Sequence, residues 1–160
     1  MKIDVDFILE NLIKDLANEY SHWHFYIQAS TNVVGLHRLE LSEFFEKQAS
    51  SEMNHVLEFR KLIQGLITKR NLKINIPNEV AKFKENLKDP IDLLSFALEM
   101  EDKVVSNYTQ RIKETCLFQE NNETDAVDGK YIELFLEDQI QDSRADADEI
   151  REILKRSIDF

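Results

Sequence analysis

Two side chains suited to holding a cation stand three residues apart, at Glu52 and His55. Residues with this spacing lie on one face of an α-helix, one turn apart, so a carboxylate oxygen and an imidazole nitrogen can reach the same point. Together they make half of a transition-metal site. Because Glu-x-x-His is common by chance, the prediction depends on further carboxylates at matching positions on other helices.

Such carboxylates interrupt the apolar stripes of two other predicted helices. Glu19 lies mid-stripe in residues 4–32, and Glu101 is the carboxylate on the stripe of residues 89–115. A buried carboxylate is costly unless it is paired or bound to a metal, and packing alone does not explain these. The helices of Glu19 and Glu52 are joined by a short loop and must pack antiparallel, which brings both acids to a similar height. The sequence therefore predicts a metal centre inside a helical bundle.

The composition predicts a few long helices. The chain of 160 residues contains only three Gly and two Pro, and long stretches lack both. We therefore expect an all-α chain that forms one domain, residues 1–160. The predicted helices span residues 4–32, 39–66, 89–115 and 131–156. Asp89-Pro90 is typical of an N-cap followed by a first helical turn.

Residues 67–88 break the helical pattern and predict a long crossover between the second and third helices. An extended chain covers up to ~3.3 Å per residue against ~1.5 Å in a helix, so this segment can run the length of the bundle and set the two helices parallel. We expect its basic side chains to be solvated, with a weak anion or partner surface as the alternative. These side chains are Lys69, Arg70, Lys73, Lys82, Lys84 and Lys88.

The last predicted helix follows a polar loop, residues 118–130, and leaves no room for a fifth helix. Its apolar stripe is broad, so the pattern does not fix which polar groups point inward. Three of them keep the best spacing with the apolar positions, namely Gln139, Asp142 and Asp146.

Charge and composition exclude several function classes. The 31 acidic and 20 basic residues give a net charge of −11, which opposes binding to nucleic acid phosphates and either attracts cations or serves solubility. No apolar run reaches the ~18 residues of a membrane span, and the N-terminus does not resemble a signal peptide. The single cysteine, Cys116, excludes an internal disulfide and indicates a reducing cytoplasm.

These motifs resemble those of the ferritin family, specifically the non-haem bacterial ferritins, over all four helices. Asn18-Glu19-Tyr20-Ser21 leading to Tyr26 is similar to the family's Glu followed by Tyr seven residues later. The segment from Phe44 to His55 resembles "F-x-K-Q-A-x-E-E-M-x-H" of the family. The segment from Pro90 to Glu101 resembles the run ending in "A-L-E-H-E", with Met100 in place of its histidine.

The resemblance implies a di-iron centre within one subunit. Glu19, Glu52 and His55 would hold one iron, and Glu52 would bridge to a second iron bound also by Glu101. The implied activity is that of a ferroxidase, in which dioxygen or peroxide oxidises Fe(II) to Fe(III) for storage. The implied assembly is a homo-oligomeric cage of twenty-four subunits, with twelve or fewer left open by the missing fifth helix.

Further residues follow from the same resemblance. Tyr26 would lie beside the iron pair, where the family uses a tyrosine in oxidation chemistry, or serve as a core aromatic bonded to a carboxylate. Gln139 resembles the glutamine of the fourth ferritin helix, and Asp142 the acid one turn later. Ser51 replaces a second acid of bacterial ferritins, which argues against an accessory third iron site.

Two alternatives to a ferroxidase remain at this point. One is another di-iron oxidoreductase, such as a rubrerythrin-like peroxidase or a bacterioferritin, although the last helix has no Glu-x-x-His. His22 could supply a second histidine ligand, but we expect it to be a structural, hydrogen-bonded residue. Met53 falls where bacterioferritin binds haem, yet non-haem ferritins share this motif, so haem is not indicated. The second alternative is non-enzymatic, either a miniferritin-like shell that protects DNA or a bundle serving only as a scaffold.

Overall fold

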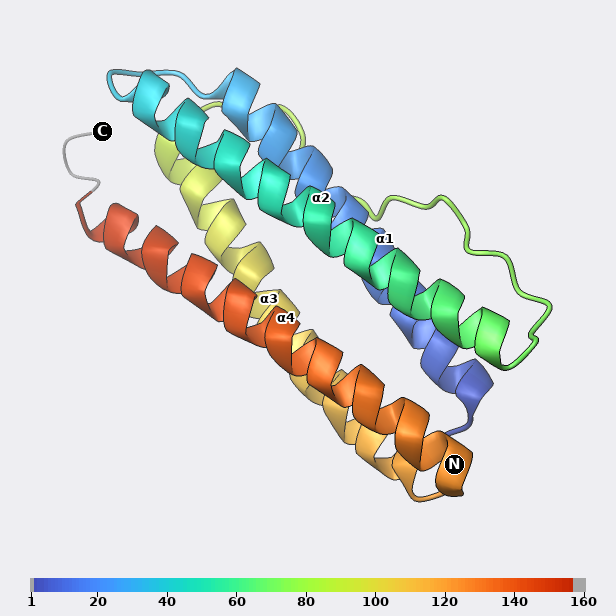
Figure 1. Ribbon diagram of the computed structural model, residues 1–160. Coiled ribbons are helices and arrows are strands. Elements are labelled where there is room, and N and C mark those ends of the chain that lie inside the picture. The colour runs from blue at the N-terminus through green and yellow to red at the C-terminus, as the bar shows by residue number, and fades with distance from the viewer. Residues whose placement is uncertain (1, 157–160) are drawn as a thin grey trace.

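Four long helices and no strand make up the computed structural model, which describes residues 2–156. The helices are α1 (Val5–Asn32), α2 (Arg38–Lys69), α3 (Pro90–Gln119) and α4 (Glu123–Lys155). Figure 1 shows them as two antiparallel hairpins, α1 with α2 and α3 with α4, lying against each other. The predicted all-α bundle with a crossover before α3 is confirmed. None of these helices carries a stretch apolar and long enough to span a bilayer.

Local capping explains where α1 and α3 begin. The Asp4 carboxylate accepts a hydrogen bond from the Phe7 N–H at 2.9 Å, which satisfies a free donor of the first turn of α1. Asp89 accepts from the N–H groups of Ile91 and Asp92, both at 3.1 Å, and Pro90 occupies the first helical position of α3. The Asp89-Pro90 cap predicted from the sequence is therefore confirmed.

The start of α4 differs from the prediction. Residues 118–130 were expected to form a loop, but α4 begins at Glu123, with the Asn122 side chain accepting from the Asp125 N–H at 2.8 Å. Gly129 lies inside the helix, where a Cβ atom would come within 2.4 Å of the Gln119 side chain. This glycine therefore marks a close approach of α4 to the end of α3, rather than a helix end.

Buried ion pairs attach the end of α2 to the start of α4. Arg70 donates to Asp128 at 2.8 Å and to Asp125 at 2.6 Å, and Lys69 also donates to Asp128. Both aspartates are buried. The expectation of a solvated side chain was wrong for Arg70, whose partners belong to the segment that was predicted to be a loop, whereas Lys69 is exposed as expected although it is paired.

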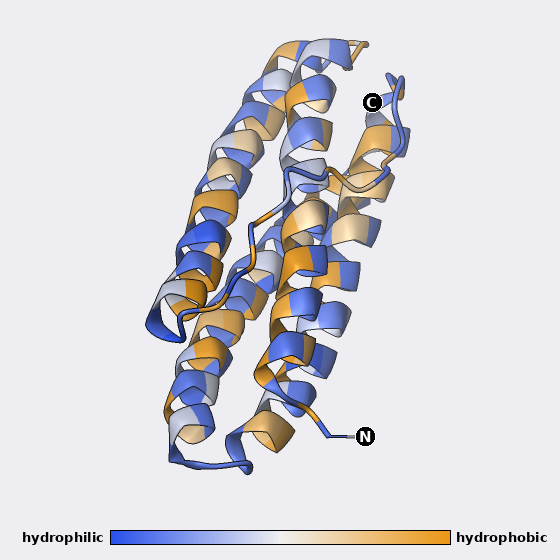
Figure 2. Ribbon diagram, turned by 90° about the vertical axis from the view of Figure 1, so that its right-hand side faces the viewer, coloured by the Kyte–Doolittle hydropathy of each residue, from blue (hydrophilic) through white to orange (hydrophobic). Residues whose placement is uncertain are grey.

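The crossover, residues 70–89, is attached to α1 near its middle and at its end. The Ala81 N–H donates to the Ala17 carbonyl, and the Val34 N–H donates to the Lys88 carbonyl, each at 3.1 Å. Figure 2 shows this segment running across the face of the bundle that carries α1 and α3. The crossover therefore covers one side of the α1–α3 interface.

Two apolar clusters fill the bundle, and a band of polar residues separates them along every helix. One cluster contains Leu12, Phe59, Tyr108 and Leu136, and the other contains Phe25, Phe45, Leu94 and Ile150. Most buried polar residues fall between these stretches in sequence, whereas Thr115, Asp125 and Asp128 lie near the turn that joins α3 to α4. The sequence thus places a polar centre between two apolar clusters.

Candidate metal centre

Three carboxylates from three helices lie in the polar band. Glu19 of α1, Glu52 of α2 and Glu101 of α3 are each only 1% exposed. Their positions on the apolar stripes turn them inward, as the sequence predicted. Buried carboxylates this close together repel one another when ionised, so the arrangement needs protons or cations to be stable.

Two tyrosines bind these glutamates in a reciprocal pattern. The Tyr26 hydroxyl of α1 donates to Glu101 Oε1 of α3 at 2.8 Å, and the Tyr108 hydroxyl of α3 donates to Glu19 Oε1 of α1. On each helix the tyrosine follows the glutamate by seven residues, or two helical turns. Each tyrosine therefore fixes one oxygen of the opposite glutamate and leaves the other oxygen free.

The free oxygens of these glutamates have no donor. Glu19 Oε2 and Glu101 Oε2 are buried without a hydrogen-bond partner among residues 2–156, as is Gln48 Oε1. Leaving a buried acceptor unpaired costs ~1–3 kcal/mol, and more for a charged group. A cation would satisfy these oxygens. The residues present therefore fit a bound metal, and carboxylate oxygens with imidazole nitrogen suit iron or manganese.

His55 connects the carboxylates to α4 through its two ring nitrogens. Its Nδ1 lies 3.2 Å from Glu52 Oε2 and 3.8 Å from Glu19 Oε2, while Nε2 lies 3.4 Å from Asp142 Oδ2. Histidines that bind metals commonly donate their second N–H to a carboxylate, which fixes the ring and its tautomer. His55 is therefore oriented to present Nδ1 to the centre while Asp142 holds Nε2.

Two groups of ligand atoms share Glu52. One comprises Glu19, His22 and Glu52, and the other Glu52, Glu101 and Asp146, with the atoms of each group within 4.8 Å of one another. A common carboxylate between two groups is the geometry needed to hold two adjacent cations. His22, which was expected to be a structural, hydrogen-bonded histidine, offers a ring nitrogen to the first group.

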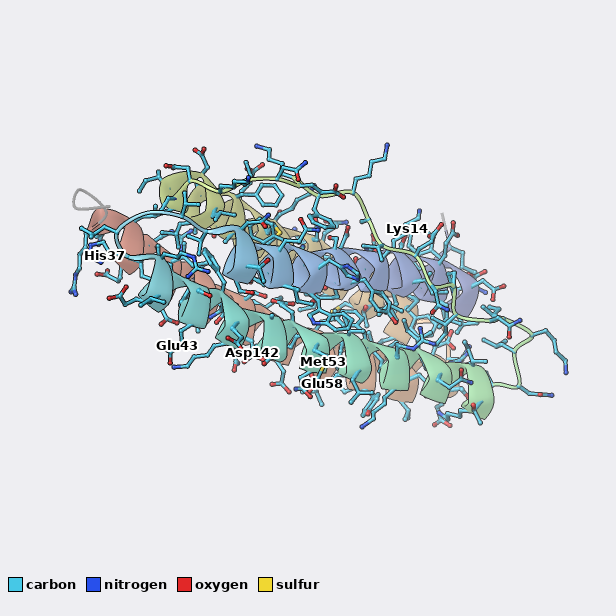
Figure 3. All side chains as sticks on the ribbon, turned by 90° about the horizontal axis from the view of Figure 1, so that it is seen from above. Lys14, His37, Glu43, Met53, Glu58 and Asp142 are labelled. Carbon is cyan, nitrogen blue, oxygen red and sulfur yellow. The ribbon has the colours of Figure 1, made fainter. Side chains whose placement is uncertain are left out.

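The polar residues of α4 occupy different positions from those expected. Gln139 is buried, but its amide donates to Glu58 Oε2 at 3.0 Å. Asp142 has a side chain 60% exposed and contacts the centre through His55; Figure 3 shows it beside α2. Asp146, one turn further along, is the α4 acid that joins a ligand group. Met53 is 53% exposed and lies outside both groups.

Burial and mutual repulsion shift the proton affinities of this cluster. Burial, followed by the charge of Glu52, raises the pKa of Glu19 to about 8, and the same two causes raise the pKa of Glu101 well above its usual value. Burial alone would lower the pKa of His55, but the hydrogen bond and charge of Glu52 outweigh it and raise this pKa to about 10. Burial raises the pKa of Asp146 to about 6. Without a cation, the folded centre therefore retains protons at neutral pH.

The fold and this cluster define a class, the helical bundles that carry a buried carboxylate–histidine centre between their helices. The chain belongs to the ferritin family, since the family's ferritin-like domain matches residues 9–157.

Solved structures share this architecture. A ferritin-like diiron-carboxylate protein from Bacillus anthracis is 25% identical, with a TM-score of 0.77 over 96% of this chain and 99% of its own. A dodecameric thioferritin from Bacteroides fragilis, described as bacterioferritin-related, is 19% identical, with a TM-score of 0.59 over 98% of this chain and 94% of its own. The similarity to the thioferritin supports the shared fold and nothing more specific. Comparison with curated proteins finds no match.

Proposed function

We propose that this protein oxidises Fe(II) to Fe(III) at the carboxylate centre and stores the product. The observation that carries the proposal is the pair of buried glutamate oxygens, Glu19 Oε2 and Glu101 Oε2, that have no donor among the described residues. They lie on opposite helices around Glu52, which belongs to both ligand groups. Such oxygens attract a hard divalent cation more strongly than any neutral substrate.

Glu19, Glu52 and Glu101 would hold the iron together with His22 and Asp146, which complete the two ligand groups. His55, whose Nδ1 lies 3.2 Å from Glu52 Oε2, would be a further ligand. Iron supplies the electrons: two Fe(II) ions each lose one electron, and dioxygen with two protons becomes hydrogen peroxide, or peroxide with two protons becomes two water molecules. We assign Asp142 and Gln139 to supporting positions, because Asp142 contacts the centre through His55 and Gln139 bonds to Glu58.

The protein's own groups prepare the site in two ways. Tyr26 and Tyr108 keep one oxygen of Glu101 and Glu19 occupied, so each glutamate offers a single oxygen in a fixed direction. The protons retained by Glu19 and His55 leave when a cation enters, because metal ligands must be deprotonated. Tyr26 also places a phenol beside the centre, where it can supply an electron and a proton to an oxidant.

Anaerobic Fe(II) titration followed by exposure to air tests the proposal. We expect stoichiometric binding and rapid oxidation, and loss of both in Glu101→Ala. Glu99→Ala is the matched control, because Glu99 lies on the same helix and is exposed. Equal oxidation rates in the two variants, or no stoichiometric oxidation in the unmodified protein, would contradict the assignment.

Storage requires an enclosed assembly, and we propose a homo-oligomeric cage in the cytoplasm. The dodecameric thioferritin supports an assembly of this kind. The exposed thiol of Cys116 is compatible with a reducing compartment. Light scattering after size-exclusion chromatography measures the assembly directly, and a monomer at micromolar concentration would contradict storage without affecting the oxidation chemistry.

A further inference from the structure

A cavity lies outside the carboxylate centre, between α1, α3 and the crossover. Its volume is about 300 Å³, at the small end of the ~300–1,000 Å³ typical of ligand pockets. The hydrogen bond from Ala81 to Ala17 holds the crossover against α1 beside it. The cavity is therefore enclosed by fixed parts of the fold on three sides.

Three lysines give this cavity a positive charge. Lys82 and Lys84 come from the crossover and Lys103 from α3, and none has an ion-pair partner among residues 2–156. Glu99 is the one carboxylate in the lining, so the excess is 3 − 1 = 2 positive charges. In a chain of net charge −11, such a local excess attracts anions and repels cations.

Aromatic rings form the apolar part of the wall. Phe83 of the crossover and Phe96 of α3 both line the cavity, and the Lys84 ammonium lies 5.4 Å from the centroid of the Phe96 ring. Asn18 and Asn107 add amide groups from the two helices. A planar apolar body can pack on the rings while its acidic group reaches the ammonium groups.

We propose that this cavity is a binding site for a small aromatic carboxylate. The lysines at the cavity supply the charge that recognises the carboxylate, and Phe83 and Phe96 supply the surface that recognises the ring. His22 and Tyr108 also line the cavity, so a bound molecule lies one side chain away from Glu19, the glutamate that Tyr108 holds. The site does not depend on iron chemistry and is present in the metal-free protein.

Calorimetric titration of the metal-free protein at low salt tests this proposal, with 2-naphthoate as the probe. We expect saturable binding of one 2-naphthoate per chain, weakened by added salt. The charge-reversed analogue, 2-naphthylmethylammonium, should not bind. Inorganic phosphate, which has the charge without the ring, should bind more weakly.

Substitutions of lining residues test whether 2-naphthoate binds in this cavity. A protein carrying both Lys84→Gln and Lys103→Gln should bind 2-naphthoate roughly tenfold more weakly, because each exposed ion pair contributes about a two- to fivefold effect. Lys113→Gln is the matched control, since Lys113 is exposed on α3 outside the cavity lining. Phe96→Leu should weaken 2-naphthoate and leave phosphate unchanged. Circular dichroism of each variant verifies folding.

Four outcomes would overturn the proposal. They are the absence of saturable 2-naphthoate binding, equal binding of the ammonium analogue, tighter binding of phosphate than of 2-naphthoate, and equal weakening by Lys113→Gln. None of these results affects the iron proposal, which rests on Glu19, Glu52 and Glu101.

Discussion

Replacing Glu19 by glutamine is expected to stabilise the metal-free protein at neutral pH while weakening its hold on a cation. Glutamine has the same shape, and its side-chain oxygen can still accept the hydrogen bond from Tyr108. The new NH₂ group takes the place of Glu19 Oε2, which has no donor, and lies beside acceptors on Glu52. The variant therefore removes a buried titrating group without removing volume.

The magnitude follows from the proton held by Glu19. Its pKa rises from 4.5 in the unfolded chain to about 8 in the folded protein, so the stability it provides is complete below about pH 4.5 and is lost as the pH rises through 8. One pH unit within this window costs about 1.4 kcal/mol, or roughly 4 kcal/mol between pH 4.5 and 7.5. Glutamine does not titrate, so the free energy of unfolding of Glu19→Gln should exceed that of the unmodified protein increasingly across this range.

Urea denaturation with a chelator present, at pH 5 and pH 7.5, measures this difference. Glu99→Gln is the control. Replacing this exposed glutamate on α3 should leave the change in the free energy of unfolding between pH 5 and pH 7.5 the same as in the unmodified protein. Excess Co(II), an oxygen-stable probe, should offset most of this difference at pH 7.5, since a cation at 100 times its Kd stabilises the unmodified protein by ~2.7 kcal/mol. A stability difference that is the same at both pH values would refute the reasoning.

Three further predictions concern the groups around the centre. Binding of Co(II) at pH 7 should release protons, because Glu19 and His55 have pKa values of about 8 and about 10 in the folded protein; calorimetry in buffers of different ionisation enthalpy measures this release. Tyr108→Phe should lower Co(II) affinity about tenfold, measured by equilibrium dialysis, because the glutamate that it holds loses its donor. Arg111→Met should lower the free energy of unfolding in urea by ~3–5 kcal/mol, because it leaves the buried Asp15 without its two bonds of 2.8 and 3.1 Å.

Each of these predictions has a control. Binding heats that are independent of the buffer would contradict proton release. Tyr131→Phe removes an exposed hydroxyl and should leave Co(II) affinity unchanged. A protein carrying Arg111→Met together with Asp15→Asn should recover most of the lost stability, and a double variant no more stable than the single one would contradict the ion-pair explanation.

The parts of the fold that depend on local sequence were predictable. Apolar periodicity and the Asp89-Pro90 cap located three helices to within a few residues, because both signals come from neighbouring positions along the chain. The start of α4 was not predictable in this way. Gly129 indicates a loop by composition, and its actual reason, the close approach of Gln119, appears only when α3 and α4 are packed together.

The candidate metal centre was likewise predictable only in the part that depends on local sequence. Glu19, Glu52 and Glu101 stand out in sequence because each interrupts an apolar stripe, and the structure buries all three. The orientation of Asp142 and Asp146 depends on how α4 rotates against α2, which a broad stripe does not specify. Tyr108 could have been found, since the seven-residue spacing of Glu19 and Tyr26 recurs on α3.

The division of the bundle into two hairpins has a consequence for how the molecule is held together. Packing is extensive within each hairpin and sparser between them, while α1, α2 and α3 each contribute a buried glutamate to the centre. The second ligand group needs both hairpins, because it joins Glu52 of α2 to Glu101 of α3 and Asp146 of α4. A chain cut within residues 70–89 should thus behave as a complementation pair, whose two fragments associate more tightly as the concentration of divalent cation rises.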